Sequence, residues 1–204
     1  MMYIVIEGQD GTGKSTQAKL LADYFKKQNR PVMLMDEPDG ELPQAHDLHD
    51  LILIKGREYH LEPLTNVLLF TASRLELWRK TALPVLQQGG VVISARNWWS
   101  TLAYQGYGEG VSRSKIIRLT KDLLPAEYVT PTHAAILNVS DAVRLERQKG
   151  RGKAKETFEA KPDDFQQRVN HAYPKIAEEF DVPIVDASAS IEDIHQQLIK
   201  LFEI

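Results

Sequence analysis

A glycine-rich run near the N-terminus carries the clearest chemistry in the chain. It is Gly8-Gln9-Asp10-Gly11-Thr12-Gly13-Lys14-Ser15, with the spacing G-x-x-x-x-G-K-[ST] of a phosphate-binding loop. Glycines let backbone N–H groups approach phosphates, and the start of a helix adds partial positive charge. Lys14 can reach the β- and γ-phosphates, and Ser15 is typical of a Mg²⁺ ligand. The run, with the adjacent Thr16, predicts binding of ATP and Mg²⁺. The alternative is a glycine-rich turn with a solvent-exposed lysine.

The segments that follow this run predict the fold that holds it. Five short runs rich in β-branched residues alternate with long amphipathic stretches, as in parallel sheets covered by helices. The runs are Tyr3–Glu7, Val32–Met35, Val91–Ser94, Ala134–Val139 and Pro183–Val185. They predict an α/β, three-layer P-loop NTPase fold, with a five-stranded parallel sheet flanked by helices. At 204 residues the chain suits one domain, 1–204, because single cores stop growing beyond roughly 250 residues.

Apolar periodicity predicts the helices. After the phosphate-binding loop, residues at i, i+3, i+4 and i+7 form one apolar face: Ala18, Leu21, Ala22 and Phe25. The segment Pro63–Gln88 is predicted to be helical with an interruption at Pro84. Ser190 begins a capping box, which predicts a last helix that ends near Phe202.

The segment from Gln148 to Lys161 has a different composition. Gly150, Gly152 and many charged residues leave no apolar periodicity. We therefore expect an exposed, mobile loop between two helices. It would form a lid over about residues 148–161 that closes over bound phosphates.

Composition limits the classes of partner. A net charge of -3 and a pI near 6.1 give no broad basic field, so we expect no binding to nucleic acid or to a membrane surface. The chain has no cysteine, which excludes disulfides and thiolate metal sites. The histidines show no H-E-x-x-H or paired ligand spacing, so a zinc site is not expected. The first apolar run is too short for a signal or a membrane span, and we expect a cytoplasmic protein.

Three further motifs follow the loop in order: Glu37-Pro38, then Leu68–Arg74, then Arg96 with Ser100–Gly106. Together with the loop, they make the chain similar to the thymidylate kinase family over nearly its whole length. The first resembles the family's R-E-P-G-G turn, the second its L-L-F-x-A-x-R helix, and the third its D-R-Y-x-x-S-x-x-A-Y-Q-G block.

The resemblance implies a pocket for a deoxynucleoside monophosphate. Asp10 would orient the deoxyribose, Phe70 would stack on thymine, Arg74 would reach the base or phosphate, and Arg96 would bind the acceptor phosphate. The implied substrate-binding residues are Glu37, Pro38, Phe70, Arg74, Arg96, Ser100, Thr101, Tyr104 and Gln105. Phe70 and Arg74 lie four residues apart, hence on one helix face. Taken singly, a phenylalanine such as Phe70 is more often a core residue, and an arginine such as Arg74 is most often a solvated charge.

Phosphoryl transfer needs positive charge near the migrating group. Because Gly11, not an arginine, lies within the loop, that charge should come from the lid. Arg151 is the first candidate, and Arg147 the second or an adenine contact. The resemblance also implies that Val185–Ala187 lies near the donor adenine. The predicted catalytic residues are Lys14, Arg96, Arg151 and Asp10.

Four residues depart from the family pattern: Asp36, Ala95, Asn97 and Glu109. Ala95 stands where the family has an aspartate that lies near Mg²⁺ and the reacting phosphates. Asp36 and Glu109 replace arginines that are frequent in the family, and Asn97 replaces an aromatic residue. Two hypotheses follow: either Asp36, Glu37 or Asp10 supplies the missing carboxylate through a water-mediated Mg²⁺ contact, or catalysis is impaired.

The resemblance implies phosphorylation of dTMP to dTDP with MgATP, in dTTP synthesis, by a homodimer. One alternative is a kinase for another deoxynucleotide or for a nucleoside, since such P-loop kinases share the loop. Another is a catalytically weak, ATP-binding regulatory protein, suggested by Ala95. A GTPase is the least favoured, because the chain has no convincing N-K-x-D motif.

Overall fold

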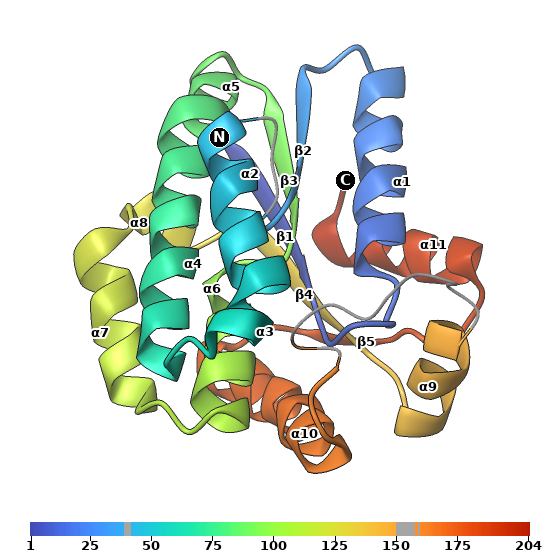
Figure 1. Cartoon of the computed structure of the whole chain (residues 1–204). Helices are drawn as coiled ribbons and strands as arrows, with labels where there is room; N and C mark the ends of the chain where they lie inside the picture. The colour runs from blue at the N-terminus through green and yellow to red at the C-terminus, as the bar shows by residue number, and fades with distance from the viewer. Residues whose placement is uncertain (39–41, 150–157, 159) are drawn as a thin grey trace.

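A twisted parallel sheet forms the centre of the molecule, with helices on both faces (Figure 1). The computed structural model of the chain describes residues 1–38, 42–149, 158 and 160–204. The sheet order is β2-β3-β1-β4-β5. The strands are β1 (Met2–Glu7), β2 (Val32–Asp36), β3 (Val91–Ala95), β4 (His133–Asn138) and β5 (Ile184–Asp186). The five-stranded parallel sheet predicted from the sequence is confirmed, with each strand end within one residue of its predicted place.

Alternation along β1 shows how the two helical layers are built. Ile4 and Ile6 are fully buried against α1 (Lys14–Lys27) and α11 (Ile191–Phe202). Tyr3 and Val5 point to the opposite face of the sheet, where they join the larger of the two hydrophobic cores. A central parallel strand is covered on both faces and therefore reads as a continuous apolar run. The three-layer arrangement is confirmed.

The larger core lies under a layer formed mainly by α4 (Pro63–Leu77) and α10 (Asp163–Phe180), with the π-helical segment η3 (Leu102–Gly108) packed against α10. The remaining described helical segments are short. They are α2 (Pro43–His49), η1 (Asp50–Lys55), α3 (Gly56–Tyr59), η2 (Trp78–Ala82), α5 (Leu83–Gln87), α6 (Trp98–Thr101), α7 (Arg113–Leu123), α8 (Ala126–Val129) and α9 (Asp141–Lys149).

The helices α1 and α11 form as the sequence predicts. The four apolar residues of the predicted α1 face are all buried against the sheet: Ala18, Leu21, Ala22 and Phe25. At the start of α11, the hydroxyl of Ser190 accepts a hydrogen bond from the backbone N–H of Asp193 at 3.1 Å. This contact satisfies one of the N–H groups that a helix start leaves without a partner.

The predicted interruption at Pro84 is wrong in position. The chain is α-helical to Leu77, widens to the π-helical η2, and is α-helical again in α5, whose first turn contains Pro84. Proline has no N–H to donate and its ring crowds the carbonyl four residues earlier. The backbone accommodates this one turn before the proline, and the helical path continues.

Most of the predicted lid, including Arg151, lies outside the described residues, so it stays a prediction. Its flanking helices, α9 and α10, are present on either side. Among the described helices, none is both long and apolar enough to cross a membrane.

The strand order brings the candidate functional segments together at the carboxyl ends of the strands. β1 lies between β3 and β4, and the carboxyl ends of β1, β3 and β2 are neighbours because all these strands are parallel. In open α/β sheets, ligands bind at this edge, where neighbouring connections leave in opposite directions. The phosphate-binding loop follows β1 at that place.

Trp78 offers a test of the larger core. Its ring is fully buried, 4.9 Å from that of Tyr3 and 5.4 Å from that of Tyr128, measured between centroids. Replacing Trp78 with alanine should lower the free energy of unfolding by about 3–5 kcal/mol, because it leaves a cavity. Urea unfolding followed by circular dichroism measures the change. Trp78→Phe should cost much less, since the indole N–H has no hydrogen-bond partner in the described part of the chain. Equal losses in the two variants would contradict the packing argument.

Candidate active site

The glycine-rich loop has the backbone shape that a phosphate cradle needs. Gly8 and Gly13 adopt φ angles of 139° and 98°, which residues with a side chain rarely adopt. A Cβ atom at Gly8 would lie 2.4 Å from the carbonyl oxygen of Leu137. Glycine is therefore required at Gly8 by both conformation and space. The loop leads directly into α1, which begins at Lys14.

Lys14 is held inside the loop. Its side chain is 6% exposed, and Nζ donates a hydrogen bond to the carbonyl oxygen of Gln9 at 2.9 Å. The carboxylate of Asp10 lies 3.8 Å from the same nitrogen. Burial and the nearby Arg96 guanidinium lower the pKa of Lys14 to about 8, against the opposite effect of neighbouring carboxylates. The ammonium group is thus confined at the position where phosphates would approach.

Asp10 joins the loop to the turn after β3. One carboxylate oxygen of Asp10 accepts a hydrogen bond from Arg96, and the other accepts one from the hydroxyl of Tyr104 at 2.6 Å. Arg96 also donates to the hydroxyl of Ser100 at 3.0 Å and lies over the Tyr104 ring, 5.3 Å from its centroid. The structure brings together four residues that the sequence assigned to one site.

Arg96 has a constrained backbone. Its φ angle is 91°, in a region that non-glycine residues seldom occupy. The N–H of Arg96 donates to the carbonyl of Ile6 at 3.0 Å, and its carbonyl accepts from the hydroxyl of Ser94 at 2.7 Å. Both neighbouring strands therefore hold the turn that aims the guanidinium at the loop. Unfavourable backbone conformations of this kind cluster at functional sites.

Glu7 organises the site, although no motif in the sequence predicts a role for it. Its side chain is fully buried at the end of β1. The carboxylate accepts hydrogen bonds from the backbone N–H groups of Asn97 at 2.7 Å and Ser100 at 3.0 Å, and from the hydroxyls of Ser100 and Tyr173. A lone acidic residue at the end of an apolar buried strand was the available signal. Such a charge needs several donors to be stable.

Arg74 and Glu37 form a buried ion pair. Arg74 is 3% exposed, and its Nε donates to the Glu37 carboxylate at 2.7 Å. The other guanidinium nitrogens donate to the hydroxyl of Thr101 at 2.7 Å and to the carbonyl of Asn97 at 2.9 Å. Tyr128 donates to Glu37 at 2.9 Å. Direct contact between Arg74 and an acceptor stays a prediction; the described contacts show it linking α4 to the turn after β3.

Aromatic side chains surround the place where the sequence predicts a base. Phe70 is 8% exposed, with the Arg74 guanidinium 5.4 Å from its ring centroid. The Phe158 ring lies 6.0 Å from that of Phe70 and 5.9 Å from that of Tyr104. Phe165 is the next ring, 6.2 Å from Tyr104. Phe70 is therefore a core residue at the border of the site, and both of its proposed roles are compatible with its position.

Other predicted residues lie around this centre. Arg147 donates to the carbonyl of Ala187 at 2.8 Å, which brings it to the loop expected near the donor adenine. Thr12 donates to the carbonyl of Gln9 at 2.9 Å, inside the loop. The amide of Gln105 donates to Glu109 at 3.3 Å. Pro38 accepts a hydrogen bond from Ser73 at 3.1 Å, which fixes the turn after β2 to α4.

The start of α1 contacts the end of β2. Ser15 and Thr16 are exposed, and the hydroxyl of Ser15 donates to the Asp36 carboxylate at 3.1 Å. Asp36 pairs in register with Ala95 of β3, which is 1% exposed. The predicted Mg²⁺ ligand thus has a carboxylate neighbour, although the third strand supplies none at Ala95.

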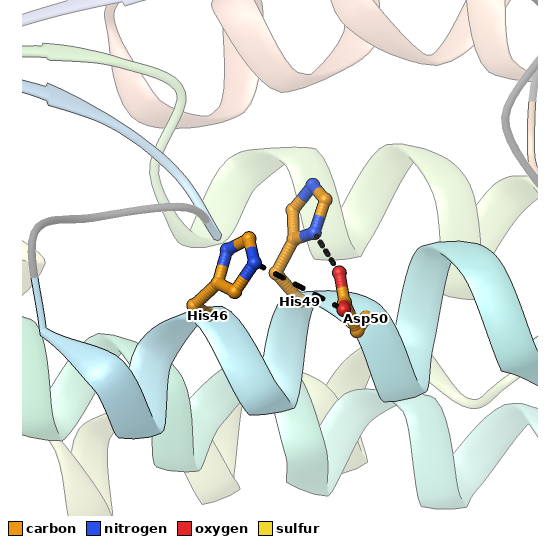
Figure 2. Close-up of side chains that lie close together, drawn as sticks. All are labelled: His46, His49 and Asp50. Carbon is orange, nitrogen blue, oxygen red and sulfur yellow. Dashed lines mark hydrogen bonds and ion pairs between the residues drawn. The ribbon is translucent and has the colours of Figure 1, made fainter.

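A second group of possible metal ligands lies on α2 and the start of η1. The spacing of the histidines predicts no metal site, but His46, His49 and Asp50 lie on one helical face (Figure 2). Asp50 is 3.2 Å from Nδ1 of His49 and 4.0 Å from Nε2 of His46. All three ligand atoms lie within 4.8 Å of one another. Imidazole donors suit zinc or other transition metals more than Mg²⁺.

The fold and the loop together define the class of the protein. A parallel sheet of this order with a phosphate-binding loop after its central strand is a P-loop nucleoside triphosphate-binding fold. The family model for thymidylate kinase matches residues 6–198, nearly the whole chain. The chain therefore belongs to the thymidylate kinase family.

Individual relatives agree with this assignment. The chain is 32% identical over 203 residues to the thymidylate kinase of Kosmotoga olearia, covering 98% of this chain and 95% of the relative. It is 39% identical over 205 residues to the probable thymidylate kinase of Pyrococcus horikoshii, covering 98% and 94%. The crystal structure of thymidylate kinase from Ehrlichia chaffeensis superposes with a TM-score of 0.76 at 29% identity, covering 100% of this chain and 98% of that one.

The lowered pKa of Lys14 gives a pH-dependent binding prediction. The free site loses the Lys14 proton as pH rises through about 8, whereas bound phosphates favour the protonated form. Affinity for a non-hydrolysable ATP analogue should therefore be roughly tenfold weaker at pH 9 than at pH 7. Isothermal titration calorimetry at saturating Mg²⁺ measures it. Lys14→Arg, which stays charged, is the control, and an equal loss of affinity in both proteins would contradict the assignment to Lys14.

Proposed function

We propose that the chain phosphorylates dTMP to dTDP, with MgATP as the phosphoryl donor, in the supply of dTTP. The contact between Asp10 and Arg96 carries this proposal. It joins the loop that would bind the donor to the arginine that would bind the acceptor phosphate. Transfer between two phosphates requires two anion-binding groups side by side, and here these would be the phosphate-binding loop and Arg96.

The reaction is an in-line transfer of the γ-phosphoryl group to an oxygen of the acceptor phosphate, with no covalent enzyme intermediate. The residues contribute position and charge. The backbone of the loop and Lys14 would hold the donor phosphates, and Arg96 the acceptor phosphate. Mg²⁺, bound at Ser15, would neutralise charge on the donor. Arg151 from the lid would add positive charge to the transferring group, and lid closure would exclude water.

Arg96 and Asp10 would change partners when the acceptor binds. The Arg96 guanidinium, 16% exposed, would bind the acceptor phosphate while its backbone stays fixed by Ile6 and Ser94. Asp10 and Tyr104 would remain beside the sugar. Because the ion pair already orients Arg96 at the loop, little side-chain entropy is lost when the phosphate replaces the carboxylate.

The base would bind against Phe70, beside the ion pair of Arg74 and Glu37. Arg74 would present its guanidinium edge to the base or phosphate from a position fixed by Thr101 and Asn97. Arg147, beside Ala187, would lie along the donor adenine. Membership of the thymidylate kinase family favours dTMP over other deoxynucleotides or a nucleoside. The relatives also give no support to a regulatory protein without turnover.

A panel of acceptors tests the function. ADP release from MgATP should be selective for dTMP when dTMP, dUMP, dGMP, dCMP, dAMP and thymidine are supplied separately, with ATP alone as the blank. Lys14→Ala should lower kcat by about 10²–10³-fold, because it removes a charge on the donor phosphates. Lys19→Ala, on the exposed face of α1, is the matched control.

The outcomes of the panel and of the Lys14 variant distinguish the alternatives. Preference for another acceptor would keep the phosphoryl-transfer mechanism and replace the substrate. ATP binding without turnover on any acceptor would favour the regulatory alternative. Unchanged kcat in Lys14→Ala would contradict the role of the loop.

A homodimer also belongs to this proposal, as does a cytoplasmic location without nucleic acid or membrane partners. Leu64 and Leu68, one turn apart on α4, are 37% and 46% exposed. Such an apolar strip suits the surface of a second copy. Light scattering coupled to size exclusion should give the mass of a dimer, and Leu68→Glu should shift it to that of a monomer. Leu123→Glu, 45% exposed on α7, should not; dissociation by both changes would point to a different surface.

A further inference from the structure

The carboxylate of Asp36 accepts a hydrogen bond from Ser15, the predicted Mg²⁺ ligand of the phosphate-binding loop. We propose that Asp36, at the end of β2, is the metal-side carboxylate of this chain and takes the place left empty by Ala95 at the end of β3. The proposal deepens the proposed function, because it names a residue that positions the metal of the same site. It rests on three observations: a contact, a strand register and the contacts of the other carboxylates nearby.

The contact is with the predicted metal ligand itself. The hydroxyl of Ser15 donates to Oδ2 of Asp36 at 3.1 Å, and both side chains are exposed at the mouth of the loop. A cation bound to the Ser15 oxygen would lie within one water molecule of this carboxylate. Mg²⁺ keeps several of its waters and binds proteins through one or two carboxylates, so a water-mediated contact suits it.

The register explains how one strand end can replace another. Asp36 and Ala95 are paired residues of the parallel strands β2 and β3, so their side chains leave the sheet on the same face. That face is the α1 face, since Ala95 packs in the core with α1. Neighbouring strands are about 4.8 Å apart, and Asp36, from its own strand, is in direct contact with Ser15.

The other carboxylates near Lys14 have different partners. Glu7 is fully buried and accepts from the turn after β3. Asp10 accepts from Arg96 and Tyr104. Glu37, the neighbour of Asp36, points to the opposite face, where Arg74 and Tyr128 bind it. Among these four carboxylates, Asp36 is the exposed one in contact with Ser15.

Metal-linked nucleotide binding tests the proposal without turnover. The affinity for a non-hydrolysable ATP analogue is measured by calorimetry with excess Mg²⁺ and again with EDTA. The ratio of the two affinities is the metal gain, the factor by which Mg²⁺ strengthens nucleotide binding. Asp36→Asn should reduce this gain by about 10–100-fold, the usual effect of losing a group that orients a metal ligand. Its affinity in EDTA should stay the same or rise, because a negative charge near the phosphates is removed.

Two further variants separate a metal role from a local structural one. Asp23→Asn changes a half-exposed aspartate further along α1, removes the same charge away from Ser15 and should keep the full gain. Ala95→Asp in the Asp36→Asn background should restore part of the lost gain, since it returns a carboxylate to the same face. Mg²⁺ is used rather than Mn²⁺ because His46, His49 and Asp50 could bind Mn²⁺ and distort the titration.

Several results would overturn the proposal. One is an unchanged metal gain in Asp36→Asn. Another is an equal loss of affinity with and without Mg²⁺, which would mean that Asp36 only supports the loop. Failure of Ala95→Asp to restore any gain, in a double variant that unfolds at the wild-type temperature, would exclude exchange between the two strand ends.

The result is independent of the acceptor panel. A chain that phosphorylates dTMP yet keeps its metal gain without Asp36 would retain the proposed function and lose this inference. A chain that phosphorylates no acceptor but loses its metal gain when Asp36 is replaced would retain this inference and lose the proposed function.

Discussion

The buried carboxylate of Glu7 is the constraint on which the site depends. It lies at the end of β1 and accepts hydrogen bonds from the backbone of the turn after β3. The carboxylate therefore joins two segments that are about ninety residues apart in the sequence. A buried charge without such donors would be strongly destabilising. The phosphate-binding loop and the Arg96 turn therefore have to form together. Together with the pairing of β1 and β3, this side chain fixes the distance between the phosphate-binding loop and the Arg96 turn.

Fixed geometry on one side of the site contrasts with exchangeable contacts on the other. Around Glu7 every partner is a buried backbone or hydroxyl group, whereas Asp10 and Arg96 meet at a partly exposed surface. In such a pair, a ligand phosphate can replace the carboxylate, which has the same sign of charge, at small cost. The arginine is already partly desolvated before the ligand binds. A rigid frame that carries a few replaceable ion pairs suits a reaction in which position and charge do most of the work.

Much of the fold could be predicted because it depends on local periodicity. The five strands are β-branched runs, and α1 shows its apolar face at Ala18 and Phe25 without reference to any other segment. The grouping of the candidate site residues could be predicted where residue types follow a motif, as for Lys14 and Arg96, which both lie beside Asp10. Glu7 could not, because its partners lie on a turn distant in the sequence. The burial of Arg74 and the shift from Pro84 to the π-helical turn also depend on tertiary packing that no single segment encodes.

The ion pair of Glu37 and Arg74 limits how this chain could evolve. Both side chains are almost completely buried, and loss of one partner of such a pair costs about 3–5 kcal/mol, a large part of the stability of a typical domain. A substitution at Arg74, the proposed contact to the base or phosphate, would therefore be removed by poor folding before any effect on substrate choice could be selected. New acceptor preferences are more accessible through neighbours such as Phe70, whose replacement leaves no buried charge. In this lineage, purifying selection for folding would protect substrate choice as a by-product.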